Sequence, residues 1–349
     1  MLIKLLIFII IFSVIVIVHE GGHCVIGKMS GIGVKEFSIG LGPTLFGVRR
    51  GETLYSIKLF PFGGITIFEG EDPDEADSPK SFRKASVGAR FATVLAGPFM
   101  NFVLSFFLSL IVIGSLGYDL PVLDSVIEGY PAQEAGFQAG DRIVSINNKK
   151  IVIYRDITLW TMFNEGKRAD IVYERNGELR RASVTPRYST ADQRFLFGFR
   201  GPNGYTKGNP LQVIRYSLTE VRYWIEVTVK SLMMLFSGRF SVNDLAGPVG
   251  VADVVGDVYE SSRESGAFYI WMNMLSLVIL LTADLGVMNL LPFPALDGGK
   301  LVFIIFEALT GRKPNEKVEG IINLIGMSFL MVLMFYVMFN DIHRLFTGP

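Results

Sequence analysis

Four long stretches of apolar residues, separated by polar regions, dominate the pattern of the chain. They run over about 1–18, 91–117, 267–296 and 321–340. Each is close to the roughly 20 residues that a helix needs to cross the hydrocarbon core of a bilayer. A long polar region, 118–266, separates the second stretch from the third. The pattern therefore predicts an α-helical integral membrane protein with four transmembrane helices.

Composition supports residence in a lipid bilayer. Half of the 349 residues are apolar and only 19% are charged, and the mean hydropathy is +0.41. An ordinary soluble chain carries more charge. Lys plus Arg and Asp plus Glu number 33 each, so no overall basic field favours nucleic acid as a partner. The one cysteine, Cys24, excludes an intrachain disulfide framework.

Basic residues predict the orientation of the helices. They are frequent in the 28–90 loop and again in the short loop before the last apolar stretch. Loops rich in Lys and Arg stay in the cytoplasm, and acidic residues contribute little to this rule. We therefore expect both loops on the cytoplasmic side and the 118–266 region outside.

The 118–266 region is expected to hold a separate folded insert. Short strand-like runs alternate with turn residues up to about residue 190, and the stretch 129–141 resembles the fingerprint of PDZ domains. Such domains bind peptide C-termini by strand addition, although a PDZ fold acting only as a spacer or size filter is an equal alternative. From 210 to 236 apolar residues recur every three or four positions, which predicts an amphipathic helix.

These patterns divide the chain into four parts. We expect helices 1 and 2 with the loop between them, a PDZ (α+β) domain, a linker with the amphipathic helix, and helices 3 and 4, over 1–117, 118–190, 191–266 and 267–349 respectively.

A metal-binding motif follows the first apolar stretch. His19-Glu20-Gly21-Gly22-His23 matches HExxH, and two of the three histidines in the chain belong to it. Residues four apart share one face of a helix, so two imidazoles can bind one zinc while the Glu acts on its water. Ionisable groups at membrane depth are costly and indicate function. Two histidines that merely cap the helix end are the less favoured alternative.

A catalytic zinc site needs a third protein ligand, and Asp297 is the candidate. It lies in the line Asn289-Leu290-Leu291-Pro292-Phe293-Pro294-Ala295-Leu296-Asp297-Gly298-Gly299. Helices 1 and 3 both run inward, so Asp297 at the end of helix 3 reaches the depth of the two histidines. The two prolines should break the helix there.

A β-hairpin is expected in the first loop. The runs 53–60 and 65–68 flank Pro61-Phe62-Gly63-Gly64, and these turn residues predict a reversal between two strands. An exposed strand edge could satisfy the backbone of an extended peptide. An ordinary cytoplasmic hairpin without this role is the alternative.

Taken together, the HExxH motif, the PDZ-like insert and the N-x-x-P-x-P-x-L-D-G line resemble the site-2 protease family of intramembrane zinc metalloproteases. The layout is most similar to the bacterial regulator-of-sigma-E protease group with a single PDZ domain. Supporting matches are Ala96-Gly97-Pro98-Phe99-Met100-Asn101-Phe102 and Gly247-Pro248-Val249-Gly250.

The resemblance implies roles for particular residues. It makes His19, His23 and Asp297 the ligands of Zn²⁺, and Glu20 the catalytic acid and base. It makes Asn289 a substrate contact. The predicted hairpin is similar to the family's membrane-reentrant β-loop, so substrate binding is also expected at Gly63, Gly64, Ile65 and Thr66.

The implied function is hydrolysis of peptide bonds within transmembrane segments of single-span membrane proteins. Anti-sigma factors and remnant signal peptides are equally suitable substrates. The implied location is the bacterial cytoplasmic (inner) membrane, with the active site near the cytoplasmic side and the PDZ domain outside. A non-catalytic membrane PDZ receptor with a structural metal is the alternative; a metal transporter ranks last, because only Asp284 adds an acid within the crossings.

Two residues depart from the family pattern. Gly21 stands where the family usually has a larger side chain, and Asp284 where it often has a neutral polar residue. We expect Asp284 to be protonated or hydrogen-bonded within the helix bundle; a role in a water channel or proton relay is the alternative.

Overall fold

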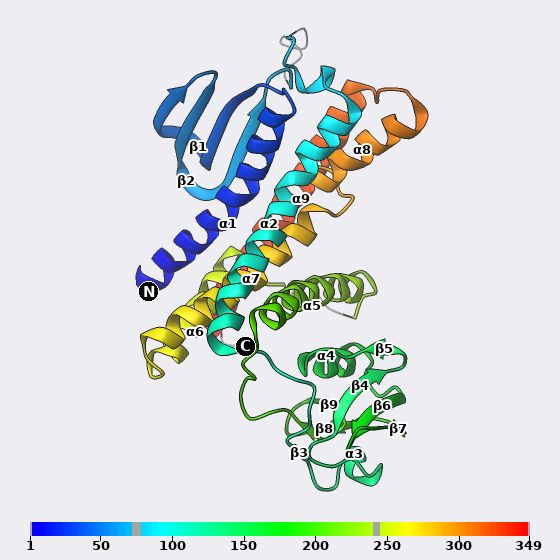
Figure 1. The fold of residues 1–349 in the computed structure, drawn as a ribbon. Coiled ribbons are helices and arrows are strands. Elements are labelled where there is room, and N and C mark those ends of the chain that lie inside the picture. The colour runs from blue at the N-terminus through cyan, green and yellow to red at the C-terminus, as the bar shows by residue number, and fades with distance from the viewer. Residues whose placement is uncertain (1, 72–77, 240–244, 348–349) are drawn as a thin grey trace. The chain divides into compact units, whose positions relative to one another are not determined.

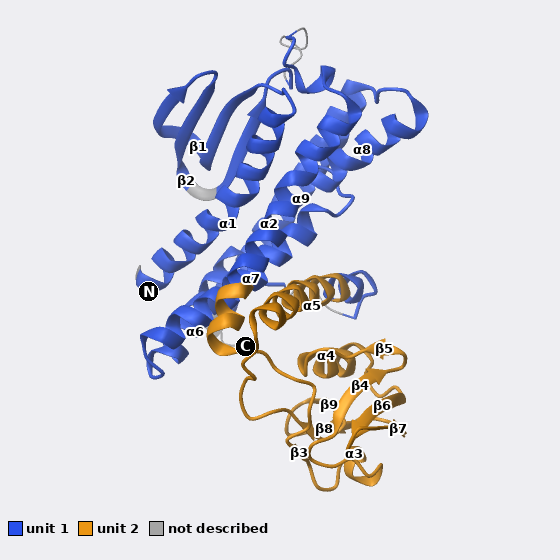
Figure 2. Ribbon diagram, viewed as in Figure 1, with its two compact units in different colours: residues 1–108, 231–349 blue, residues 109–230 orange. Residues whose placement is uncertain are grey.

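The computed structural model describes residues 2–71, 78–239 and 245–347. The chain forms two compact units, one made of residues 1–108 and 231–349 and the other of residues 109–230 (Figure 2). Each unit is described by itself below.

The first unit is mainly helical (Figure 1). Its helices are α1 (Leu2–Met29), most of α2 (Val87–Leu116), α6 (Pro248–Arg263), α7 (Ala267–Asn289), α8 (Asp297–Thr310) and α9 (Glu316–Thr347), with a 3-10 turn at Phe82–Lys84. Apolar side chains of α1, α6 and α7 form one buried cluster that includes Phe8, Ile15, Val255 and Leu277. This cluster holds the first helix against the third predicted crossing.

Among the residues that the structure describes, four helices are long and apolar enough to cross a membrane, as the sequence predicts. The spans are Ile3–Met29, Val87–Leu116, Ala267–Asn289 and Glu316–Arg344. Only 11% of the apolar window in the last span is buried within the protein. Apolar surface on this scale is unfavourable in water and suits contact with lipid.

The helix boundaries beside the predicted metal ligands differ from the sequence prediction. The first apolar stretch was expected to end at residue 18, but α1 continues through the HExxH motif to Met29. The third was expected to reach residue 296, but α7 ends at Asn289. Asp297 therefore begins a new helix instead of ending the third one, which is a correction to the predicted placement.

The loop between α7 and α8 explains how Asp297 is presented. A Cβ on Gly298 would lie 2.1 Å from the carbonyl oxygen of Leu291, and one on Gly299 would lie 2.4 Å from that of Phe293. Only residues without a side chain allow this close approach. The two glycines thus let the first turn of α8 pack directly on the proline-containing loop before it.

A small sheet lies between α1 and α2 in the chain. Its strands β1 (Val34–Arg50) and β2 (Thr53–Phe68) pair with each other over several segments. Ile39 lies opposite both Ile57 and Gly64, so the first half of β1 has a segment of β2 on each side. Residues 36–39 of β1 run parallel to residues 54–57 of β2 and antiparallel to residues 64–67. The chain therefore reverses direction between Phe60 and Gly64.

The predicted hairpin is thus correct in its reversal and wrong in its pairing. The runs 53–60 and 65–68 do not pair with each other, because the first half of β1 lies between them. Within the described part of the chain, the segment 64–68 pairs with β1 on one side only. It is an edge segment of the sheet.

The second unit contains a four-stranded sheet in the order β5-β4-β6-β7. The strands of this unit are β3 (Ser125–Val126), β4 (Arg142–Ile146), β5 (Lys149–Lys150), β6 (Ala169–Arg175), β7 (Glu178–Val184), β8 (Arg187–Ser189), β9 (Arg194–Leu196) and β10 (Phe199–Arg200). Its helices are α3 (Pro131–Glu134), α4 (Arg155–Phe163) and the greater part of α5 (Pro210–Phe236). The buried core includes Ile143, Ile171, Trp160 and Phe197. Helix α5 confirms the helix expected at 210–236.

Candidate metal centre

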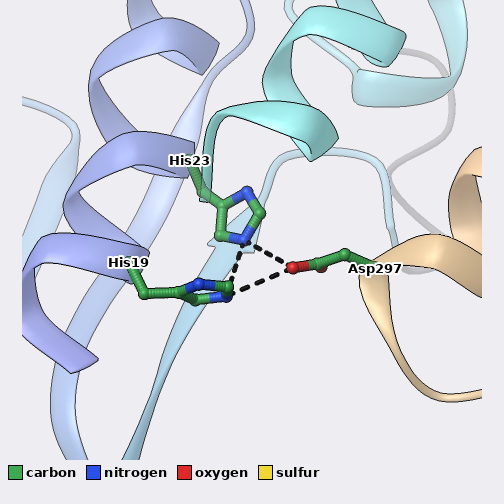
Figure 3. A group of neighbouring side chains, drawn as sticks. All are labelled: His19, His23 and Asp297. Atoms are coloured by element: carbon green, nitrogen blue, oxygen red, sulfur yellow. Dashed lines mark hydrogen bonds and ion pairs between the residues drawn. The ribbon is translucent and has the colours of Figure 1, made fainter. Parts of the chain in front are cut away.

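Three side chains from two distant segments meet in the first unit. His19 and His23 extend from the same face of α1, and Asp297 from the first turn of α8, toward a common point (Figure 3). The Nε2 atoms of the histidines are 3.2 Å apart, and each lies 3.2 Å from Oδ2 of Asp297. Both histidines are 7% exposed. We call these three residues the triad.

The spacing of the triad fits a tetrahedral zinc ion. With zinc-to-ligand bonds of about 2.0–2.1 Å, neighbouring ligand atoms in a tetrahedron lie about 3.3 Å apart. In addition, Oδ2 of Asp297 is buried, and the two imidazole nitrogens are its only neighbours among the polar groups that the structure describes. A buried carboxylate oxygen that faces the lone pairs of two neutral imidazoles is costly unless a cation satisfies all three groups. Two imidazoles and one carboxylate are a known ligand set for catalytic zinc, which leaves one position open.

Helix α2 packs closely against the motif. A Cβ on Gly22 would lie 2.5 Å from the carbonyl oxygen of Ala96, whereas nothing lies within 4 Å of one on Gly21. Gly22 is therefore the glycine of the motif that admits the neighbouring helix. This contact also explains why the paired glycines do not end α1, because packing offsets the roughly 1 kcal/mol that each costs within a helix.

Gly97 provides the space for an imidazole of the triad. A Cβ at this position would lie 2.2 Å from Nε2 of His23. We predict that Gly97→Ala displaces the ring and strongly reduces the zinc content of the purified protein. Gly88→Ala is the matched control, since Gly88 lies on the same helix with open space around its Cα. Normal zinc content in the Gly97 variant would contradict this packing.

The second nitrogen of each histidine faces α2. Nδ1 of His23 is 2.9 Å from the carbonyl oxygen of Thr93, and Nδ1 of His19 is 3.2 Å from Nδ2 of Asn101. Sequence reasoning did not assign these contacts. The spacing of Thr93, Gly97 and Asn101, which are four residues apart, indicates that they share one face of a helix. It does not indicate which residues that face contacts.

Glu20 is held by the edge segment of the sheet. Oγ1 of Thr66 donates a hydrogen bond to Oε2 of Glu20 at 2.7 Å and lies 3.2 Å from its carbonyl oxygen. A Cβ on Gly64 would lie 2.9 Å from Cγ of Glu20. Gly64 and Thr66, two residues apart in a strand, thus face α1 together. The contact connects the predicted substrate-binding segment directly to the proposed acid and base.

This hydrogen bond leads to a prediction for Thr66. Thr66→Val keeps the shape of the side chain but loses the donor to a charged group, and we expect kcat to fall roughly tenfold while zinc content stays unchanged. Thr66→Ser should restore the rate because it restores the hydroxyl. An equal loss in both variants would show that shape, and not the hydrogen bond, is what matters.

A cation lies one turn after Asp297. Nζ of Lys300 is 3.3 Å from Oε1 of Glu71, which follows β2. Partial burial of Lys300 disfavours its charged form, but the carboxylates of Glu71 and Asp297 outweigh this effect and raise the pKa of Lys300. The ion pair connects the helix that carries Asp297 to the end of the strand that carries Thr66.

Four other residues that the sequence analysis singled out lie outside the triad. Asn289, the predicted substrate contact, is the last residue of α7 and is half-buried. Gly63 lies at the reversal of β2 with a φ of +79°. Ile65 is 39% exposed. Asp284 lies within α7 and is half-buried.

Comparison with known proteins identifies the family. A family model described as peptidase family M50 matches residues 7–333. A relative from Clostridium acetobutylicum is 35% identical over 97% of each chain. The zinc metalloprotease RasP of Geobacillus kaustophilus is 31% identical, over 97% of each chain. A protein of Bacillus subtilis named regulator of sigma-W protease RasP is 29% identical, over 97% of this chain and 98% of its own.

The family match covers both motif segments and includes all or part of each of the four apolar helices. The Geobacillus kaustophilus relative is named a zinc metalloprotease, which agrees with a triad spaced for zinc. The chain therefore belongs to peptidase family M50, the site-2 protease family, and is a bacterial multi-pass membrane zinc metalloprotease.

Proposed function

We propose that this protease cleaves peptide bonds within or beside the transmembrane segments of single-span membrane proteins, with the triad as its zinc ligands and Glu20 as acid and base. The observation that carries this proposal is the buried, mutually equidistant triad beside Glu20 on a helix apolar enough to span a membrane. Anti-sigma factors and remnant signal peptides are the substrate classes we favour, and the name of the Bacillus subtilis relative, regulator of sigma-W protease, supports the first of them.

Glu20 is proposed to move the proton in this reaction. When bound at the triad, zinc polarises the scissile carbonyl and lowers the pKa of a water molecule toward 7. Glu20 takes the proton from the attacking water and delivers it to the leaving amine. Thr66 holds the carboxylate through Oε2, which leaves Oε1 available to the water. Asn289 is retained as a proposed contact to the substrate backbone.

The edge segment 64–68 is proposed to hold the substrate. A helical substrate hides its own peptide carbonyls, so it must become extended before cleavage. An extended peptide satisfies its freed backbone groups by pairing with a strand edge. The side chains of Gly64 and Thr66 are directed at α1, and the backbone at Gly63, Gly64, Ile65 and Thr66 provides the proposed pairing positions. Pairing there would place the substrate beside Glu20.

The insert is proposed to be a PDZ domain outside the cytoplasmic membrane that receives peptide C-termini. A cavity of about 540 Å³ in the second unit supports this, and its lining includes Thr158 and Met162 of α4, Arg194 of β9 and Phe197. Apolar and cationic side chains together suit a peptide with a terminal carboxylate. The basic loops support a cytoplasmic placement of the metal site.

Co-expression tests the proposal. Tagged single-span candidate substrates are expressed with the wild-type protease or with its Glu20→Gln variant, and the tag is followed by immunoblot. We expect a shortened product only with the wild type. Candidates that remain full length with both proteins, while purified protease holds zinc, would contradict the proposed substrate class.

A further inference from the structure

The amide of Asn101 makes an unusual contact with the triad. Asn101 is completely buried on α2, and its Nδ2 lies 3.2 Å from Nδ1 of His19. Its Oδ1 is buried and has no hydrogen-bond partner. The nitrogen and oxygen of an amide have nearly the same shape, so their assignment follows from the hydrogen bonds they make.

The contact of His23 shows what a metal ligand of this kind requires. Its Nδ1 faces the carbonyl oxygen of Thr93 at 2.9 Å, and a carbonyl oxygen can only accept. Nδ1 of His23 must therefore carry the ring proton, which leaves a lone pair on Nε2 directed at the triad. A neutral imidazole that binds metal through Nε2 always has its proton on Nδ1.

The same requirement applies to His19. Its Nε2 belongs to the triad, so its Nδ1 must also carry the proton and needs an acceptor. An amide nitrogen at that position would set a donor against a donor. Rotating the amide of Asn101 by about a half-turn brings Oδ1 to Nδ1 of His19, and no existing bond of Oδ1 is lost because it makes none.

We propose that Asn101 is a positioning residue whose Oδ1 accepts a hydrogen bond from the Nδ1–H group of His19. This hydrogen bond fixes the tautomer and the ring orientation that bind zinc. The inference rests on the proposed metal site and adds a residue to it. Thr93, Gly97 and Asn101 then form one face of α2. Thr93 and Asn101 accept hydrogen bonds from the triad histidines, and Gly97 leaves space for the ring of His23.

Zinc affinity in the full-length protein tests this role without any substrate. Zinc retained by the purified, detergent-solubilised protein is measured against a competing chelator, which gives an apparent dissociation constant. Asn101→Leu removes the acceptor at similar volume, and loss of such an outer partner weakens metal binding about 10- to 100-fold. Asn101→Asp keeps an acceptor and loses the donor, so it should bind within about threefold of wild type.

A control substitution and the Asp variant make the result decisive. Ser105→Ala, on the same face of α2 one turn further from the triad, should not change zinc affinity; its hydroxyl contacts the carbonyl oxygen of Ile279. If Asn101→Leu fails to fold, the Asp variant alone decides, because the opposite amide orientation predicts that it loses zinc. Wild-type affinity in the Leu variant, or equal weakening in Leu and Asp, would overturn the proposal.

The design separates this inference from the function on which it rests. If wild type and Ser105→Ala hold zinc while Asn101→Leu also holds it, only the role of Asn101 fails. If the wild-type protein binds no zinc, the metal site fails and the role of Asn101 fails with it.

Discussion

Glu20→Gln is expected to abolish cleavage while the protein keeps its zinc. Gln has nearly the same shape and can still accept the hydrogen bond from Thr66, so the fold around α1 should not change. It cannot take a proton from water, and loss of a general acid–base group typically lowers the rate about 10²- to 10⁴-fold. The measurement is the rate of substrate cleavage together with the zinc content of the same preparation.

Glu260→Gln is the matched control for this experiment. It makes the same chemical change on α6, where Glu260 pairs with Lys4 and is exposed, and should leave cleavage unchanged. Unchanged cleavage in Glu20→Gln would remove the proposed mechanism. Such a result would also favour the alternative that the metal only stabilises the fold, because a purely structural metal site does not need this carboxylate.

The second large effect is expected at Asp297. Asp297→Asn replaces the anionic oxygen that lies 3.2 Å from both imidazoles. A ligand should contribute more than its outer partners do, so zinc affinity should fall by more than about a hundredfold and cleavage should be lost with it. Chelator competition on the purified protein measures the affinity.

Asp284→Asn provides the comparison for Asp297. Asp284 lies in α7, outside the triad, so the same substitution should leave zinc affinity unchanged. A rate reduced at normal zinc content would support a relay role for Asp284. Equal zinc loss in the two variants would contradict the assignment of Asp297 as the third ligand.

The metal site could be predicted from the sequence because each step depended on local periodicity. His19 and His23 share a helix face at any position along a regular helix. The common direction expected for the first and third helices was enough to predict that Asp297 lies beside the two histidines, as it does, even though Asp297 begins α8 instead of ending α7.

Features that depend on tertiary contacts could not be predicted in this way. The apolar pattern ends at residue 18 and gives no sign of how far α1 continues beyond the motif, whereas the close contact of Gly22 with Ala96 depends on a neighbouring helix. The insertion of β1 between two segments of β2 depends on pairing between residues far apart in the chain.

The roles of Thr66 and Asn101 also depend on tertiary contacts. Thr66 was predicted to bind substrate, but the hydrogen bond from its side chain to Glu20 was not predicted. Asn101 was noted only as part of a family-like stretch. Its proximity to His19 joins residues 82 positions apart, which no local pattern reveals. Motif spacing therefore identifies the reacting groups better than the groups that orient them.

X-ray absorption at the zinc edge of the purified full-length protein is the most direct test of the metal centre. The account predicts one zinc per chain, with two imidazole nitrogens and one carboxylate oxygen at about 2.0–2.1 Å, and loss of this signal in Asp297→Asn. Zinc bound without imidazole ligands, or an unchanged spectrum in that variant, would contradict it.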